Sequence, residues 1–137
     1  MASGHVASTN EAFDKWLARG RPAFVPRAGA PPDEVFVRIH EAGGIASLAH
    51  PGLLRHDDWV HEFAEAGLDA IEAYHSEHDP PMTATYLAIA RRLHLGISGG
   101  SDYHADGSHG AAALGAVALP AAEFEDLQRR AARRRPL

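Results

Sequence analysis

Apolar residues recur along this chain at two spacings, one typical of helices and the other of short buried strands. The helical spacing, with apolar positions three or four residues apart, gives several segments one apolar face. Most of these segments begin at proline or acidic residues and end next to glycine, as helices often do. They predict helices over residues 10–18, 32–42, 57–66, 80–93 and 120–130.

Four short apolar runs, bounded by glycine, proline or polar residues, are too short for helices and predict buried strands. They cover residues 45–49, 69–74, 95–98 and 114–119. Because strands alternate with helices, the order predicts a mainly parallel sheet with helices outside it. An α/β barrel has eight strands and typically about 250 residues. The pattern therefore leaves open an open sheet or part of a larger barrel.

Composition limits the possible functions without identifying one. The chain has 137 residues, which predicts a single domain, and no cysteine, which excludes disulfides, thiolate metal sites and a cysteine nucleophile. Its net charge of −5 does not favour general nucleic-acid binding. No apolar run reaches the length of a membrane span, and the N-terminus does not resemble a signal peptide, so we expect a cytoplasmic protein without a membrane partner.

Arginines cluster near the C-terminus, and we treat residues 129–137 as a basic tail. Its simplest interpretation is a frayed, solvated helix end, where cations also suit the helix dipole. A contact for phosphate or RNA is the alternative. The arginines concerned are Arg129, Arg130, Arg133, Arg134 and Arg135.

Potential metal ligands follow three of the four predicted strands. His50 comes directly after the first strand, His75 after the second, and Asp102 and His104 after the third. Because ligands of parallel α/β sheets bind at the carboxyl ends of strands, we expect these side chains to meet at one rim. Imidazole nitrogen and carboxylate oxygen together suit zinc, manganese or iron.

The sequence also predicts how the backbone presents these groups. Pro51 favours an extended conformation at His50. Asp102 and His104 are two residues apart, so in an extended segment both side chains point the same way. Glycines at 99 and 100 allow tight backbone geometry just before the acid.

Other polar residues have simpler interpretations. Glu72 lies within a predicted strand, where it is a ligand, a supporting acid or an interior residue that needs a partner. His75 and His78 are alternatively solvated loop residues. The remaining histidines have no position that argues for chemistry, and we treat them as surface residues: His5, His40, His56, His61, His94 and His109.

Four segments in order carry a more specific signal: AGGIASLAHPG, GLDAIEAYHSEH, LGISGGSDYH and LGAVALP. Together they resemble the C-terminal half of PHP (polymerase and histidinol phosphatase) domain phosphoesterases. The resemblance is greatest to the branch of nucleoside 3′,5′-bisphosphate phosphatases and 5′-3′ exoribonucleases that act on short RNA. It covers nearly the whole chain and implies a single partial PHP domain over residues 1–137. The implied fold is half of a distorted α/β barrel, with mainly parallel strands, outer helices and a multi-metal centre at the carboxyl rim.

The resemblance also implies roles for individual residues. His50 matches the ligand of the family's His-Pro motif, and Asp102 and His104 match its late Asp-x-His ligand pair. His75 and His78 match a segment near the site, where we expect contact with substrate or its phosphate. The implied cofactors are divalent ions of manganese, zinc or iron, and the implied substrate is a small phosphate ester or short RNA. No residue is identified as the catalytic acid or base.

One family feature is missing from this sequence. The family's site begins with a His-x-His motif on the first strand, and this sequence contains no His-x-His. Two interpretations stay open: a phosphoesterase whose other ligands come from another chain or from preceding sequence, and an inert fragment or pseudoenzyme with a partial metal site. Because half a barrel exposes unpaired strand edges, we also expect self-association or marginal stability.

Overall fold

The structure is a computed structural model that describes residues 4–26, 28–104 and 113–134. By its contacts the chain divides into two compact units, Met1–Ala30 and Pro31–Leu137. The prediction of one partial domain over the whole chain stays a prediction. None of the helices in the described ranges is long and apolar enough to cross a membrane.

The first unit contains the predicted N-terminal helix in two parts. Helix α1 (Thr9–Ala12) continues directly into a π-helical segment, η1 (Phe13–Leu17). Ser8 caps α1, because its hydroxyl oxygen accepts a hydrogen bond from the backbone N–H of Glu11. The carboxylate of Glu11 in turn accepts the backbone N–H of Ala7.

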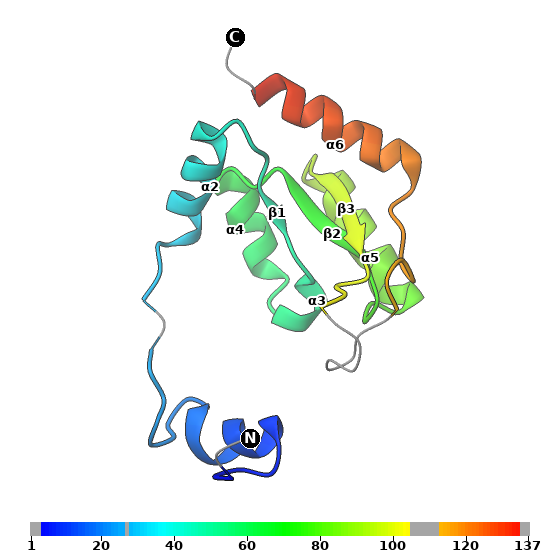
Figure 1. Cartoon of the computed structure of the whole chain (residues 1–137). Helices are drawn as coiled ribbons and strands as arrows, with labels where there is room; N and C mark the ends of the chain where they lie inside the picture. The colour runs from blue at the N-terminus through cyan, green and yellow to red at the C-terminus, as the bar shows by residue number, and fades with distance from the viewer. Residues whose placement is uncertain (1–3, 27, 105–112, 135–137) are drawn as a thin grey trace. The chain divides into compact units, whose positions relative to one another are not determined.

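A parallel sheet forms the centre of the second unit (Figure 1). Its strands are β1 (Ser47–Leu48), β2 (Ala70–His75) and β3 (Gly96–Gly100), in the order β1-β2-β3. Both pairings are parallel, with Ser47 beside Ala70 and Ala70 beside Gly96. The first three predicted strands and their parallel arrangement are therefore confirmed, although β1 is shorter than its apolar run.

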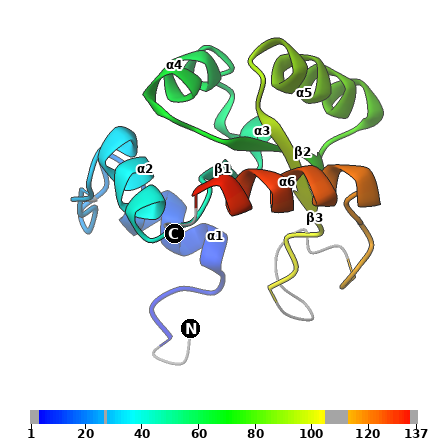
Figure 2. The ribbon, with the colours of Figure 1, turned by 90° about the horizontal axis from the view of Figure 1, so that it is seen from above.

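Helices surround this sheet as predicted. In the second unit these are α2 (Pro32–Glu41), α4 (Asp58–Ala66), α5 (Pro80–Arg92) and α6 (Ala121–Arg134). Helices α4 and α5 lie on one face of the sheet (Figure 2). The core lies between these helices and the strands, and its most deeply buried members are Val60, Ala70, Ile71, Ala73 and Ala90.

The prediction of a fourth strand at residues 114–119 is wrong. These residues form a turn and irregular backbone, with a hydrogen bond from Ala116 N–H to the Ala113 carbonyl. Gly115 has a φ of +76°, which interrupts an extended path, and Leu114 is 79% exposed. The apolar run is thus not buried, so burial does not stabilise a strand there.

A short helix that the sequence pattern did not predict, α3 (Pro51–Leu54), begins immediately after His50. Proline suits the first helical position, because its fixed φ is already helical and it has no N–H to leave unpaired. The ring of Pro51 is buried. This helix makes the chain turn sharply at the carboxyl end of β1.

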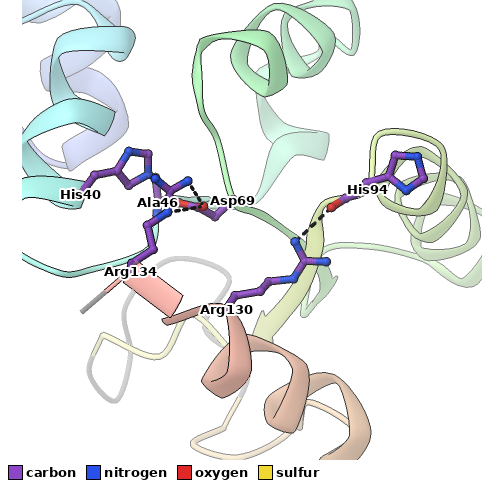
Figure 3. A network of polar contacts seen from close by, with 6 residues as sticks. All are labelled: His40, Ala46, Asp69, His94, Arg130 and Arg134. Carbon is purple, nitrogen blue, oxygen red and sulfur yellow. Dashed lines mark hydrogen bonds and ion pairs between the residues drawn. The ribbon is translucent and has the colours of Figure 1, made fainter. Parts of the chain in front are cut away.

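The expectation of a frayed helix end is wrong for the part of the basic tail up to Arg134, because these residues are helical. Helix α6 continues to Arg134 and packs at the amino-terminal ends of β2 and β3. Arg130 donates to the His94 carbonyl (3.0 Å) and Arg134 to Asp69 Oδ1 (2.7 Å), as Figure 3 shows. These contacts tie α6 to the body of the unit. Residues 135–137 lie outside the described part of the chain.

Asp69 is the hub of this network (Figure 3). Besides Arg134, it accepts hydrogen bonds from His40 Nε2 (2.7 Å) and from the backbone N–H of Ala46 (2.8 Å), both at Oδ2. His40 was expected to be a surface residue. Its side chain is instead mostly buried, with 18% exposed, and the bond to Asp69 fixes its position. His109, another expected surface residue, lies outside the described residues.

Candidate functional site

At the carboxyl ends of the three strands, four polar side chains follow one another in pairwise contacts. The rings of His50 and His75 meet edge to face, with 5.7 Å between their centroids. Asp102 lies between His75 and His104, because its Oδ2 is 3.7 Å from His75 Nε2 and its Oδ1 is 3.1 Å from His104 Nε2. The expectation that these side chains meet at one rim of the sheet therefore agrees with the structure. The roles of the individual residues stay predictions.

The backbone of His50 differs from the extended conformation expected before proline. It is left-handed, with φ +31° and ψ +58°. The carboxylate of Glu72 stabilises this turn, since its Oε2 accepts the backbone N–H of His50 at 2.7 Å. Glu72 thus has a partner in the interior, and it anchors the residue that matches the His-Pro ligand.

Asp102 also has a left-handed backbone, with φ +49°, so the expected extended segment from Asp102 to His104 is wrong. Their side chains meet nonetheless through the 3.1 Å contact. The tight backbone geometry expected at the glycines before Asp102 is found at Gly99. A Cβ on Gly99 would lie 2.6 Å from the Cβ of Tyr74, where the pairing of β2 with β3 is irregular.

The two ring nitrogens of His75 have different surroundings. Nδ1 faces the turn that follows β2, and Nε2 faces the rim. Its Nδ1 accepts the backbone N–H of Glu77 at 3.1 Å. Its Nε2 is buried and has no hydrogen-bond partner among the described residues. Because a nitrogen that accepts a hydrogen bond carries no proton, the neutral ring has its proton on Nε2.

His78 differs from His75 because both of its ring nitrogens are occupied. Nδ1 donates to the Ala73 carbonyl (3.0 Å), and Nε2 accepts the backbone N–H of Gly52 (3.3 Å). Its ring lies 5.1 Å from that of Tyr86. This geometry favours a supporting role for His78 beneath His75, and the predicted substrate contact of His78 stays a prediction.

Tyr86 extends this support to the segment before α4, a connection for which the sequence contains no signal. Its hydroxyl donates to Asp57 Oδ1 at 2.8 Å. Burial, together with the hydrogen bond and the negative charge of Asp57, raises the pKa of Tyr86 well above its usual value. Tyr86 therefore stays protonated as a donor at neutral pH.

His50 Nδ1 is the second buried ring nitrogen with no partner in the described ranges. Buried polar atoms are nearly always paired, so two such atoms at one rim indicate a ligand. The donor types, imidazole and carboxylate, fit a divalent metal ion. Their number does not suffice, because no three His, Asp or Glu side chains among the described residues stand together to hold one.

Comparison with known proteins gives a consistent assignment, although no family model matches the chain. Over 106 residues it is 37% identical to the 5′-3′ exoribonuclease Rnm of Escherichia coli (strain K12), an alignment that covers 74% of this chain and 36% of that protein. It is 33% identical over 115 residues to the 3′,5′-nucleoside bisphosphate phosphatase of Chromobacterium violaceum, covering 79% of this chain and 40% of that protein.

A solved structure extends the match to the fold. A candidate metal-dependent phosphoesterase from Bifidobacterium adolescentis superposes with a TM-score of 0.75 at 26% identity, over 94% of this chain and 46% of that one. This chain belongs to the PHP family. It corresponds to the C-terminal half of the PHP fold, as the four motifs indicated. The chain spans less than half the length of these relatives.

Proposed function

We propose that this PHP chain supplies part of the active site of a metal-dependent phosphoesterase. The observation that carries the proposal is the pair of buried nitrogens, His50 Nδ1 and His75 Nε2, that have no partner among the described residues. The carboxylate of Asp102 lies beside the second of them. An unpaired buried nitrogen costs free energy, and a bound ligand removes that cost. A site for a cation and a phosphate oxygen accounts for both atoms.

Within this proposal, His50, Asp102 and His104 would contribute ligands to a divalent ion of manganese, zinc or iron, and further ligands would come from outside the described residues. Such an ion would supply positive charge for the phosphate oxygens and would lower the pKa of a bound water. The residues of the chain provide orientation: Glu72 fixes the His50 backbone, and Asp102 contacts His104. His75 contacts the phosphate of the substrate.

The substrate that we propose is a nucleoside 3′,5′-bisphosphate or a short RNA. The two curated relatives support this class, since one is named a 3′,5′-nucleoside bisphosphate phosphatase and the other a 5′-3′ exoribonuclease. Both substrates present a phosphate ester beside a ribose. The net charge of −5 argues against broad binding of long nucleic acids and fits a small or short substrate.

An incomplete site is the second candidate, in which the chain by itself is catalytically inert. It is favoured by the absence of a three-ligand metal cluster among the described residues and of any His-x-His in the sequence. The other ligands would then come from the part of the PHP fold that this chain does not span, in preceding sequence or another chain. Strands β1 and β3, at the two ends of the sheet order, are the edges through which such a segment or a second copy can pair.

Phosphate release from adenosine 3′,5′-bisphosphate tests both candidates. The chain is assayed with manganese by itself, and also fused behind the segment of the Chromobacterium relative that precedes the matched region. Hydrolysis by the fusion, lost in its His50→Ala and Asp102→Ala variants, is the result that we expect. Activity of the unfused chain would reject the inert candidate, whereas a folded but inactive fusion would count against the phosphoesterase proposal.

A further inference from the structure

We infer that His75 binds an anionic phosphate oxygen as a neutral hydrogen-bond donor through Nε2–H, and that it acts neither as a metal ligand nor as a general acid. The inference rests on the proposed function and assigns one residue of that site its protonation form and its ligand. It depends on the hydrogen bonds that surround the two ring nitrogens.

The turn after β2 fixes the tautomer of His75. The backbone carbonyl of His75 accepts the N–H of His78 at 3.1 Å, which closes the turn. Within this turn the N–H of Glu77 donates to His75 Nδ1, also at 3.1 Å. An N–H donor can approach Nδ1 only where that nitrogen presents its lone pair. The proton of the neutral ring is therefore on Nε2, the atom that faces the rim.

Packing prevents the ring from exchanging its two nitrogens. The side chain of His75 is 1% exposed. Its ring packs against those of His50 and His78, with centroid distances of 5.7 Å and 5.1 Å. His78 is itself held by Ala73 and Gly52, so it cannot easily move aside. A flip of the His75 ring would also break the bond from Glu77.

In the part of the chain that the structure describes, the donor at Nε2 has no acceptor. The carboxylate of Asp102 is nearby, but its Oδ2 at 3.7 Å is too far for a hydrogen bond. A buried donor without an acceptor is destabilising, because its N–H has lost its hydrogen bonds to water and gained none in return. An anionic oxygen of a phosphate ester, which has several lone pairs and a negative charge, makes the strong kind of bond that this position can offer.

The same geometry excludes two other roles for His75. A metal ion needs the lone pair of Nε2. Because Nδ1 already accepts a hydrogen bond, the neutral ring would have to lose its single proton and become an imidazolate. General acid catalysis from this tautomer would leave an imidazolate, which is an equally poor product. A neutral imidazole that only donates a hydrogen bond to a developing negative charge requires neither step, and other enzymes use histidine in this way.

Nitrogen-15 NMR of the histidine-labelled full chain tests the tautomer without reference to activity. The signals of His75 are assigned by their loss in the His75→Gln variant. We expect Nδ1 to be unprotonated and Nε2 protonated, and both to stay so when zinc is added, while the His50 signals change. Loss of the Nε2 proton on zinc addition, or a proton found on Nδ1, would overturn the inference. If zinc leaves His50 unchanged, the proposed function fails, and the tautomer of His75 is still measured.

Calorimetric titration of the manganese-loaded chain with inorganic phosphate tests the donor. His75→Leu removes the N–H, whereas His75→Gln keeps an N–H donor on a side chain of similar reach. We expect the leucine variant to bind phosphate about tenfold more weakly or worse, as for the loss of one hydrogen bond to a charged acceptor, and the glutamine variant to retain most of the affinity. His61→Leu, on the exposed face of α4, is the matched control. Equal affinities for wild type and His75→Leu, or a glutamine variant as weak as leucine, would contradict the donor role.

Discussion

The carboxylate of Glu72 accepts the backbone N–H of His50, with 2.7 Å between Oε2 and the nitrogen. This bond joins the middle of β2 to the turn that follows β1. It holds His50 in a left-handed conformation that few residues other than glycine adopt. The side chain that matches the His-Pro ligand is therefore positioned by an acid from the neighbouring strand.

Replacing Glu72 by alanine should destabilise the fold, because the N–H of His50 loses its acceptor. We expect a loss of about 1–3 kcal/mol in the free energy of unfolding, measured by urea denaturation. Glu72→Gln keeps an oxygen acceptor and should lose less. Glu62→Ala, at an exposed position of α4, is the control. A Glu72→Ala variant as stable as the control would show that the bond contributes nothing.

Adding a methyl group at Gly99 should be costly, while the same change one residue later should not. A Cβ at Gly99 would lie 2.6 Å from Tyr74 Cβ and 2.9 Å from its carbonyl oxygen, whereas at Gly100 its nearest neighbour is Glu72 Oε1 at 3.8 Å. We expect Gly99→Ala to lose about 1–3 kcal/mol of unfolding free energy by overpacking. Gly100→Ala should stay within about 0.5 kcal/mol of wild type. Similar urea midpoints for the two variants would argue against this strand geometry.

The Asp69 network should make stability fall in acid. Burial by itself raises the pKa of Asp69, but hydrogen bonds from Ala46, His40 and Arg134 outweigh it, so the pKa lies below its usual value. A carboxyl group with a lowered folded-state pKa stabilises the protein above its unfolded-state pKa, about 3.9. That contribution is lost as the pH falls from there through the folded-state pKa.

Thermal unfolding of wild type and Asp69→Asn from pH 7 to pH 2 measures this effect. At neutral pH we expect Asp69→Asn to be clearly less stable, and below about pH 4 the two melting temperatures should converge. Glu41→Gln, at the exposed end of α2, should run parallel to wild type throughout. A constant difference between wild type and Asp69→Asn across the whole range would mean that ionisation of Asp69 is not involved.

The hydroxyl of Tyr86 should matter although it lies away from the rim. Tyr86→Phe removes the donor to Asp57 and leaves that carboxylate without this bond. We expect a loss of about 1–3 kcal/mol of unfolding free energy, since the acceptor is charged. In an ultraviolet pH titration, wild type should show one tyrosine that ionises well above the usual pKa of about 10, and this late step should be absent from Tyr86→Phe. Its persistence in the variant would assign it to another tyrosine.

Local patterns were enough to predict most elements of this fold and the position of the site. Apolar spacing and initial prolines located α2 and α5, and short bounded runs located the three strands. The rule that ligands gather at the carboxyl ends of parallel strands placed His50, His75 and Asp102 at one rim. These predictions succeed because each depends on a segment and its immediate flanks.

The features that could not be predicted depend on contacts between distant segments. The left-handed turn at His50 needs Glu72, 22 positions away, and the attachment of Arg134 needs Asp69, 65 positions away. The apolar run at residues 114–119 has the composition of a strand, yet the exposure of Leu114 shows that it is not buried. The tautomer of His75 depends instead on a local contact, the N–H of Glu77 two positions away, for which the sequence pattern contains no signal.

Metal content per chain tests the central claim, that the rim of this PHP chain holds a divalent ion through His50 and Asp102. The chain is purified with manganese and zinc supplied and measured by elemental mass spectrometry beside a His50→Ala/Asp102→Ala variant whose folding is checked by circular dichroism. We predict that wild type retains a divalent ion and that the folded double variant loses it. Two or more ions per chain would mean that the site is completed in the isolated protein, and a single ion would mean that it is partial. A wild type that binds no metal, or a folded double variant that binds as much as wild type, would contradict the claim.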